Sequence, residues 1–142
     1  MPDDALIQLA KDTASQIGLD AAVVCAVCEQ ESQWNKWAVR FEPAFFEKYE
    51  VPLHLATTEE YSRAFSFGLM QVMGQTAREF GFTNRFLSEL CDPATGILFG
   101  CKKLKRCFDI SGGDLATALG HYNGGADPAY PGEVMARIAT YQ

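Results

Sequence analysis

The sequence predicts a single domain that is all α-helical, or nearly so. Residues 3–17 place apolar side chains along one side of a helix, and residues 21–32 begin with an apolar run that ends in polar residues. Asp92 followed by Pro93 is a strong signal for the start of a long helix that extends to about Phe108. No two segments alternate apolar and polar residues as a pair of half-buried strands would.

The composition is that of a packed globular protein. The chain has 142 residues, of which 48% are hydrophobic and 12% aromatic. A chain of this length buries roughly two thirds of its unfolded surface. The net charge of -6 argues against nucleic acid as a partner, because phosphate binding needs a basic footprint. The prediction is one domain over residues 1–142 that acts as a monomer.

The N-terminal residues do not have the pattern of a targeting segment. Met1-Pro2-Asp3-Asp4 is acidic where a signal peptide is basic and then apolar, and no stretch reaches the length of a membrane span. We therefore expect no signal peptide, no membrane insertion, and synthesis in the cytoplasm.

The first helix, over residues 3–17, is amphipathic and has a signal at each end. Asp3 or Asp4 caps its start. Gly18 can close its end in the left-handed conformation. The chain then enters the second helix with almost no linker.

The second helix is predicted over residues 21–32, with Asp20 as its N-cap. Up to Cys28 it carries no polar side chain on any face, which is typical of a core helix surrounded by others. Its last turn carries Glu29 and Glu31 at the negative end of the helix dipole, where a carboxyl pKa is raised. Glu31 shares a face with the apolar residues before it, and shielding there suits a general acid. Spacing alone does not decide between the two glutamates, and both could instead point to solvent.

An aromatic stretch follows this helix end. Its members are Trp34, Trp37, Phe41, Phe45 and Phe46. They could form a platform on which sugar rings stack, or they could cover the core. Pro43, among them, suits the first turn of a short helix.

Four shorter helices complete the prediction, and they cover residues 58–64, 76–80, 114–119 and 133–141. Thr57 and Glu60 make a capping box for the first of them, after a loop over residues 50–57 that Pro52 breaks. Gly120 is expected to end the third.

The cysteines and a basic cluster have bland interpretations. The five cysteines, Cys25, Cys28, Cys91, Cys101 and Cys107, are expected as small buried hydrophobes, as in a reducing compartment. A metal site built from Cys25, Cys28 and His121 would have the wrong geometry, so no metal is expected. The basic cluster of Lys102, Lys103, Lys105 and Arg106 is expected on a solvated helix face.

Three motifs carry the functional signal, and each stands where a helix ends or the chain turns sharply: Glu31-Ser32, Gly68-Leu69-Met70-Gln71 and Tyr122-Asn123-Gly124-Gly125. Their order and spacing resemble the soluble lytic transglycosylase domain, the lysozyme-like catalytic module of bacterial and phage cell-wall lyases. That family carries Glu-Ser, then Gly-Leu-Met-Gln, then Tyr-Asn-x-Gly, and later a Tyr before a Val-containing helix, here Tyr130 and Val134. The resemblance extends from about residue 4 to the C-terminus.

The resemblance implies a lysozyme-like helical fold, with a central buried helix and an active-site cleft, and a role for each matched residue. Glu31, in preference to Glu29, would be the catalytic acid and base. Tyr122 would orient it through its hydroxyl, and Ser32 would hold the helix end. Asn123, beside Tyr122, would shape the turn that helps to orient the substrate. Gly68 would allow the glycan to approach closely, and Gln71 would hydrogen-bond to the sugar. The other matched residues would contact the glycan or line the cleft, and they are Leu69, Met73 and Tyr130. The sequence departs from the family pattern at Gly74, where Pro is frequent, and at His121, where a small residue is common.

The implied activity is non-hydrolytic cleavage of peptidoglycan glycan strands. One glutamate would break the β-1,4 bond between N-acetylmuramic acid and N-acetylglucosamine and close a 1,6-anhydro ring, with no cofactor. Two alternatives stay open. A muramidase would need a second carboxylate, for which Glu42 is the candidate, and an inactive module would only bind glycan or serve a virion structurally. A leaderless chain of this kind fits a phage enzyme that reaches the periplasmic cell wall after release or as part of a virion.

Overall fold

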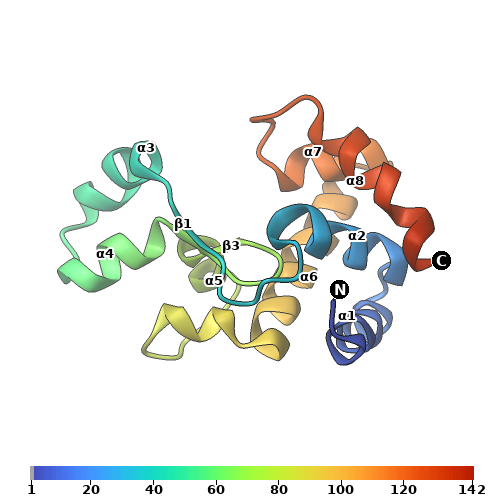
Figure 1. The fold of residues 1–142 in the computed structure, drawn as a ribbon. Helices are drawn as coiled ribbons and strands as arrows, with labels where there is room; N and C mark the ends of the chain where they lie inside the picture. The colour runs from blue at the N-terminus through green and yellow to red at the C-terminus, as the bar shows by residue number, and fades with distance from the viewer. Residues whose placement is uncertain (1) are drawn as a thin grey trace.

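The computed structural model describes residues 2–142, and Met1 of the acidic N-terminal segment lies outside the described residues. Most of the chain is helical, which confirms the predicted fold class. The α-helices are α1 (Asp4–Ile17), α2 (Ala21–Ser32), α3 (Pro43–Phe45), α4 (Thr57–Arg63), α5 (Gly74–Glu79), α6 (Pro93–Ile110), α7 (Leu115–Tyr122) and α8 (Tyr130–Ile138). Figure 1 shows a larger body built from α1, α2, α6, α7 and α8, and a smaller part in which α3 and α4 stand apart from it.

The ends of the principal helices follow the capping signals in the sequence. The Asp20 carboxylate accepts a hydrogen bond from the Ala22 amide at 2.8 Å, and Asp92 accepts one from the Thr95 amide at 3.1 Å. Gly18 ends α1 with a φ of 85°, in the left-handed region. These three predictions are confirmed because each depends only on residues within one turn of the helix end.

Helix α2 is the central helix of the larger body, as predicted. Every residue from Ala22 to Cys28 is buried, and α2 packs against α1 on one side and α8 on another. Its apolar run therefore lies inside the core, and its polar C-terminal turn emerges at the edge of the core.

A small antiparallel sheet joins the two parts of the molecule, and the sequence analysis missed it. The strands are β1 (Val39–Phe41), β2 (Phe65–Phe67) and β3 (Val72–Met73), in the order β1-β2-β3. Val39 pairs with Phe67, and Ser66 pairs with Met73. Strands of two or three residues are too short to show alternation, and the pairing of β1 with β2 is non-local, so no sequence pattern predicted them.

Several predicted boundaries were wrong. Ala56, not Thr57, occupies the N-cap of α4, so the predicted capping box does not form. Part of the predicted loop over residues 50–57 is regular, because a π-helical turn (Phe46–Glu50) leads into a 3₁₀ turn (Val51–Leu53). Helix α7 continues through Gly120 to Tyr122. A glycine weakens a helix interior but does not end it where tertiary contacts hold the next turn.

The five cysteines are free and buried, as predicted. Burial raises the thiol pKa of Cys25 to about 11 and that of Cys101 to about 12. Thiolates are therefore disfavoured, and these side chains act as small apolar groups.

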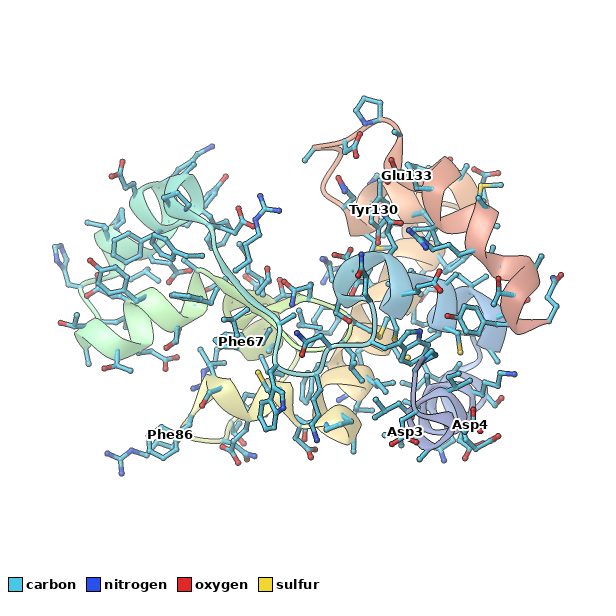
Figure 2. The ribbon with its side chains drawn as sticks, viewed as in Figure 1. Asp3, Asp4, Phe67, Phe86, Tyr130 and Glu133 are labelled. Atoms are coloured by element: carbon cyan, nitrogen blue, oxygen red, sulfur yellow. The ribbon has the colours of Figure 1, made fainter. Side chains whose placement is uncertain are left out.

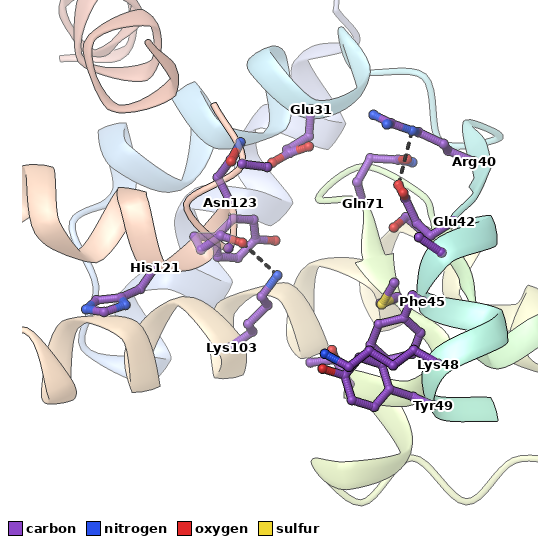
Figure 3. Close-up of a pocket in the computed structure, with 17 residues that line it drawn as sticks. Glu31, Arg40, Glu42, Phe45, Lys48, Tyr49, Gln71, Lys103, His121 and Asn123 are labelled. Atoms are coloured by element: carbon purple, nitrogen blue, oxygen red, sulfur yellow. Dashed lines mark hydrogen bonds and ion pairs between the residues drawn. The ribbon is translucent and has the colours of Figure 1, made fainter. Parts of the chain in front are cut away.

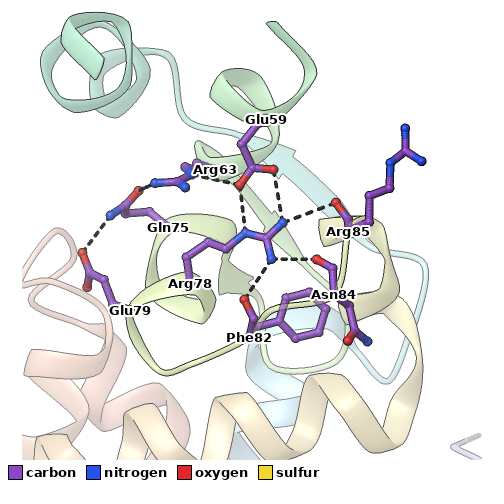
Figure 4. Close-up of polar contacts among 8 residues, drawn as sticks. All are labelled: Glu59, Arg63, Gln75, Arg78, Glu79, Phe82, Asn84 and Arg85. Carbon is purple, nitrogen blue, oxygen red and sulfur yellow. Dashed lines mark hydrogen bonds and ion pairs between the residues drawn. The ribbon is translucent and has the colours of Figure 1, made fainter. Parts of the chain in front are cut away.

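The smaller part is tied together by Arg78 of α5 (Figure 4). The guanidinium donates to the Glu59 carboxylate of α4 at 2.8 Å and to the carbonyls of Phe82 and Asn84 at 2.8 and 2.7 Å. Arg63 donates to the same carboxylate at 3.0 Å.

None of the helices in residues 2–142 has the length and apolar character needed to cross a membrane.

Candidate active site

The last turn of α2 sends its two glutamates to different surfaces. Glu31 lines a pocket with a volume of about 660 Å³. Glu29 faces away from that pocket, where its carboxylate pairs with Arg137 at 2.6 Å and accepts from the Tyr141 hydroxyl at 3.1 Å. Helical geometry separates residues i and i+2 by about half a turn, so only one of the two can face the pocket.

Glu31 sits in an environment that favours its protonated form. Burial raises the pKa of this carboxyl, and the Tyr130 hydroxyl, Lys103 and Arg40 offset part of that rise. The Tyr130 hydroxyl donates to Glu31 Oε1 at 2.6 Å. A carboxyl with a raised pKa and a fixed orientation can act as a general acid near neutral pH.

The tyrosine that orients Glu31 is Tyr130, which corrects the role expected for Tyr122. The Tyr122 hydroxyl instead donates to the Met70 carbonyl at 2.6 Å and is buried. Helix α8 begins at Tyr130 and packs against α2. This packing brings the Tyr130 hydroxyl to the Glu31 carboxylate at the end of α2, and Figure 2 shows Tyr130 beside that helix. Through this hydrogen bond Tyr122 holds the loop between β2 and β3.

Ser32 joins the end of α2 to that same loop. Its hydroxyl lies 3.0 Å from the Cys28 carbonyl and 2.8 Å from the Leu69 carbonyl. Since a hydroxyl has one proton, it donates to one of these carbonyls at a time. The contact holds the β2–β3 loop against the helix end that carries Glu31.

Gly68 and Leu69 are buried and do not line the pocket, which differs from the glycan contacts expected for them. Gly68 has a φ of 76°, and a Cβ there would lie 2.5 Å from the Leu90 carbonyl oxygen. The required glycine is thus explained by the close approach of the protein's own backbone. The Leu69 side chain is buried in the core, so only its carbonyl takes part in the site, through Ser32.

Gln71 and Met73 line the pocket beside Glu31. Gln71 has a φ of 47°, a conformation that costs free energy in a residue with a side chain. Its Nε2 donates to the carbonyls of Ala38 and Gly68 at 2.9 and 3.0 Å. Both contacts use the amide nitrogen, so the amide oxygen remains an acceptor for a ligand.

The opposite wall of the pocket comes from the chain that runs from β1 through the π-helical turn (Figure 3). Phe45 and Tyr49 line it, with their ring centroids 4.8 Å apart. Of the aromatic stretch, therefore, Phe45 can contact a ligand, whereas Trp34 is buried and donates to the Tyr141 hydroxyl at 2.9 Å. The expectation that the stretch covers the core is confirmed for Trp34, whereas stacking of Phe45 on sugar rings stays a prediction. The sequence analysis did not single out Tyr49.

Glu42 lies on the wall opposite Glu31 (Figure 3). Arg40 pairs with it at 3.1 Å. Asn123, on the same side as Glu31, lines the pocket and accepts a hydrogen bond from the Asp127 amide at 3.0 Å, which shapes the turn after α7.

Lys103 is the pocket residue that sequence reasoning assigned wrongly. The basic cluster is not uniformly solvated, because Lys103 turns inward from α6, lines the pocket and donates to the Tyr122 carbonyl at 2.8 Å. Lys105 pairs with Asp109 at the surface. Position 103 lies four residues after buried Phe99 and four before buried Cys107, and this helical spacing is a signal that could have placed it at the core edge.

The side chains weighed as metal ligands are not brought together. Cys25 and Cys28 are buried in the core, whereas His121 is exposed at the pocket rim. Within residues 2–142, no three His, Cys, Asp or Glu side chains form a group that could hold a metal ion.

Comparison with known proteins agrees with the geometry of this pocket. The family model described as the transglycosylase SLT domain matches residues 8–130, which includes the glutamate, the β2–β3 loop and Tyr130. The chain belongs to the transglycosylase SLT family. A transglycosylase of Enterobacteria phage PRD1 is 38% identical over 81 residues, which cover 51% of this chain and 28% of the relative. This SLT domain thus corresponds to under a third of that phage protein, and no solved structure matches it.

Proposed function

We propose that the protein is a peptidoglycan lytic transglycosylase that cleaves the bond between N-acetylmuramic acid and N-acetylglucosamine without water. The observation that carries the proposal is the Glu31 carboxyl, shielded at the end of a core helix and held at 2.6 Å by the Tyr130 hydroxyl. Family membership supplies the reaction class, and the pocket supplies one acid in a suitable state.

In the first step, protonated Glu31 donates its proton to the oxygen that links the two sugars. The bond from that oxygen to C1 of the muramic acid breaks, and the glucosamine leaves as an alcohol. The 2-acetamido oxygen of the muramic acid supports the positive charge at C1. General acid catalysis of this kind contributes about 10² to 10⁴ in rate.

In the second step, the ionised Glu31 removes the proton from the C6 hydroxyl of the same sugar. The C6 oxygen then attacks C1 and closes the 1,6-anhydro ring. The carboxyl is protonated again, so one residue serves as acid and then as base, and no water is consumed. The Tyr130 hydroxyl can donate to the carboxylate while it is ionised.

The remaining pocket residues suit a glycan ligand. The Gln71 amide oxygen is available to accept from a sugar hydroxyl or an acetamido N–H. Phe45 and Tyr49 offer aromatic faces on the opposite wall, and Met73 adds an apolar contact to the pocket lining. Asn123 limits the pocket at the turn after α7.

A muramidase is the second candidate, because Glu42 lies in the same pocket. A hydrolase would use a second carboxylate to activate water. The ion pair of Glu42 with Arg40 at 3.1 Å occupies one oxygen of that carboxylate.

We further propose that the enzyme acts as a monomer on glycan strands of the periplasmic cell wall, after release from the cytoplasm or as part of a virion. The phage relative supports this setting. Assaying purified virions and cell lysates for the protein distinguishes the two routes.

Product analysis tests the proposed chemistry. Purified peptidoglycan is digested with the wild type, Glu31→Gln and, as a matched control from the same helix turn, Glu29→Gln, and the soluble products are identified by mass spectrometry. We expect muropeptides with 1,6-anhydro ends from the wild type and from Glu29→Gln, and none from Glu31→Gln.

Other products would point elsewhere. Reducing ends that disappear in Glu31→Gln would identify a muramidase, and Glu42→Gln would then be tested in the same assay. No product from any of the three proteins would leave only glycan binding, without catalysis.

A further inference from the structure

Lys103 is a cation inside the pocket of an otherwise acidic protein. It projects from α6 toward the space in front of Glu31 (Figure 3). The protein carries a net charge of -6. A lysine side chain is ordinarily exposed, with its ammonium group in solvent. A lysine drawn into the active-site pocket, and shielded there, calls for a specific explanation.

The ammonium group of Lys103 is fixed by Tyr122. Its Nζ donates to the Tyr122 carbonyl at 2.8 Å and lies 4.1 Å from the centroid of the Tyr122 ring. Tyr122 is the last residue of α7, so this carbonyl belongs to the negative end of a helix dipole. Burial lowers the pKa of Lys103, and Glu31 and Cys107 offset part of that effect.

The contact with Tyr122 leaves hydrogen-bonding capacity on the pocket side. An ammonium group has three donors, and the Tyr122 carbonyl takes one of them. Among residues 2–142 no carboxylate forms an ion pair with Lys103, so its positive charge lies inside the pocket without a paired negative charge.

The charged and titratable groups that face Glu31 or line its pocket come from six elements. They are Cys28 of α2, Arg40 of β1 with Glu42 beside it, Lys48 and Tyr49 of the π-helical turn, Lys103 of α6, His121 and Tyr122 of α7, and Tyr130 of α8. Three of these groups are cations, and Lys48 is exposed to solvent. The Arg40 side chain is 74% exposed and already paired with Glu42, so solvent and Glu42 weaken its field at Glu31. Lys103 is shielded from solvent and keeps its field.

We propose that Lys103 is a positioning residue for this reaction, whose ammonium stabilises the Glu31 carboxylate after that carboxyl has given up its proton. The carboxylate otherwise forms in a shielded site at the negative end of α2, where its charge is disfavoured. Tyr130 supplies one hydrogen bond, and Lys103 supplies the opposing charge. Together they let one carboxyl release a proton in the first step and take one back in the second.

This inference rests on the proposed acid and base role of Glu31, so its test includes a measurement that needs no activity. The Glu31 carboxyl is titrated by ¹³C NMR in the wild type, Lys103→Met and Lys103→Gln. Lys103→Arg keeps the charge, and Lys102→Met is the matched control, because Lys102 lies on the same helix over Phe99 and outside the pocket. Each variant is also assayed for release of soluble peptidoglycan across pH, and its thermal unfolding is measured.

Loss of the ammonium is expected to raise the pKa of Glu31. In Lys103→Met and Lys103→Gln the titration and the alkaline limb of kcat both move to higher pH, and kcat at the optimum falls roughly tenfold. Lys103→Arg and Lys102→Met titrate like the wild type. Two neutral variants are used so that the result does not depend on one of them folding well. Gln keeps a donor for the Tyr122 carbonyl, and Met keeps the apolar stem of the side chain.

Two results would overturn the proposal. One is a lower melting temperature in the neutral variants with an unchanged Glu31 titration, which would reduce Lys103 to a support for Tyr122. The other is an equal shift in Lys102→Met, which would mean that any charge on α6 has the same effect. If no variant and no wild type releases product while the titration shifts as expected, the proposed function fails and the coupling of Lys103 to Glu31 stands.

Discussion

At the scale of single residues, two buried tyrosines make the same short hydrogen bond with different consequences. Tyr130 donates to the Glu31 carboxylate and Tyr122 donates to the Met70 carbonyl, each at 2.6 Å. A bond to a carboxylate is worth more when the carboxylate is ionised, so it changes along the reaction. A bond to a backbone carbonyl is the same throughout and contributes only to stability.

Tyr130→Phe is therefore expected to reduce turnover. The hydroxyl lowers the pKa of Glu31, so its removal should raise that pKa and move the alkaline limb of the pH–rate profile upward. The loss of a hydrogen bond to a charged group predicts a fall in kcat of about tenfold to a hundredfold. Release of soluble peptidoglycan, followed over pH, measures both effects.

Tyr122→Phe is the comparison variant, and its main effect is expected on folding. It leaves the buried Met70 carbonyl without its donor, which costs about 1–3 kcal/mol in the free energy of unfolding. If instead Tyr122→Phe moved the pH–rate profile and Tyr130→Phe did not, the roles assigned to the two hydroxyls would be reversed.

At the scale of elements, the smaller part of the molecule depends on polar contacts as well as on packing. Its aromatic cluster includes Phe41, Phe46 and Tyr61, with the rings of Phe46 and Tyr61 stacked at 4.3 Å. Beside this cluster, Arg78 links α5 to Glu59 of α4 and to the carbonyls that follow α5 (Figure 4). The link matters for the site because β2 and β3, which lie between α4 and α5, lead into the loop that carries Gln71.

Arg78→Met is expected to lower the free energy of unfolding by about 2–3 kcal/mol. The Arg78 side chain is only 16% exposed. Its loss leaves Glu59 with Arg63 alone and removes the donor to three carbonyls, those of Phe82, Asn84 and Arg85. Arg85→Met is the control, because the Arg85 side chain is exposed and only its carbonyl meets Arg78. Urea unfolding measures the free energy of unfolding of both variants. For Arg85→Met it should differ from the wild-type value by no more than about 0.5 kcal/mol. Equal losses in the two variants would contradict the specific role of Arg78.

At the scale of the whole molecule, three carboxyls make opposing contributions to stability as pH changes. Burial raises the pKa of Glu31 and of Glu50, whereas Arg78 and Arg63 lower the pKa of Glu59. A raised folded-state pKa contributes stability that is complete below the ordinary glutamate value and is lost as pH rises through the raised value. A lowered one contributes stability that is present above the ordinary value and is lost as pH falls. Stability should therefore be greatest in mildly acidic solution.

Glu50 allows this balance to be tested away from the active site. Its side chain is fully buried, and neither oxygen has a hydrogen-bond partner among residues 2–142. Glu50→Met keeps the volume and removes the buried carboxyl, so we expect higher stability at neutral pH, by about 1–3 kcal/mol. We also expect a smaller loss of stability as pH rises above the ordinary glutamate range, because burial raises the pKa of Glu50. Glu47→Met, an exposed position on the same π-helical turn, is the control. Parallel pH profiles for Glu50→Met and the wild type would sink the idea.

Local signals in the sequence determined most of the helices and the family. Asp20 and Asp92 predicted helix starts because a cap acts within one turn. The uninterrupted apolar run of α2 predicted a central helix because no face of that run carries polar side chains that could contact solvent. The three motifs predicted the SLT family because their residues, order and spacing resemble that family, and the family match confirms it.

Only the tertiary structure decided which groups meet at Glu31. Tyr130 lies 99 residues further along the chain from Glu31, and its hydroxyl arrives there because α8 packs on α2. Gly68 is required by the Leu90 carbonyl, a contact that no local pattern encodes. In the sequence, Lys103 resembles the other three cations of a surface cluster. In the structure, α7 ends beside it, and Lys103 donates to the Tyr122 carbonyl there. Chain-local physics sets where helices begin and end, whereas the partner of a buried polar group is set by whichever element packs against it.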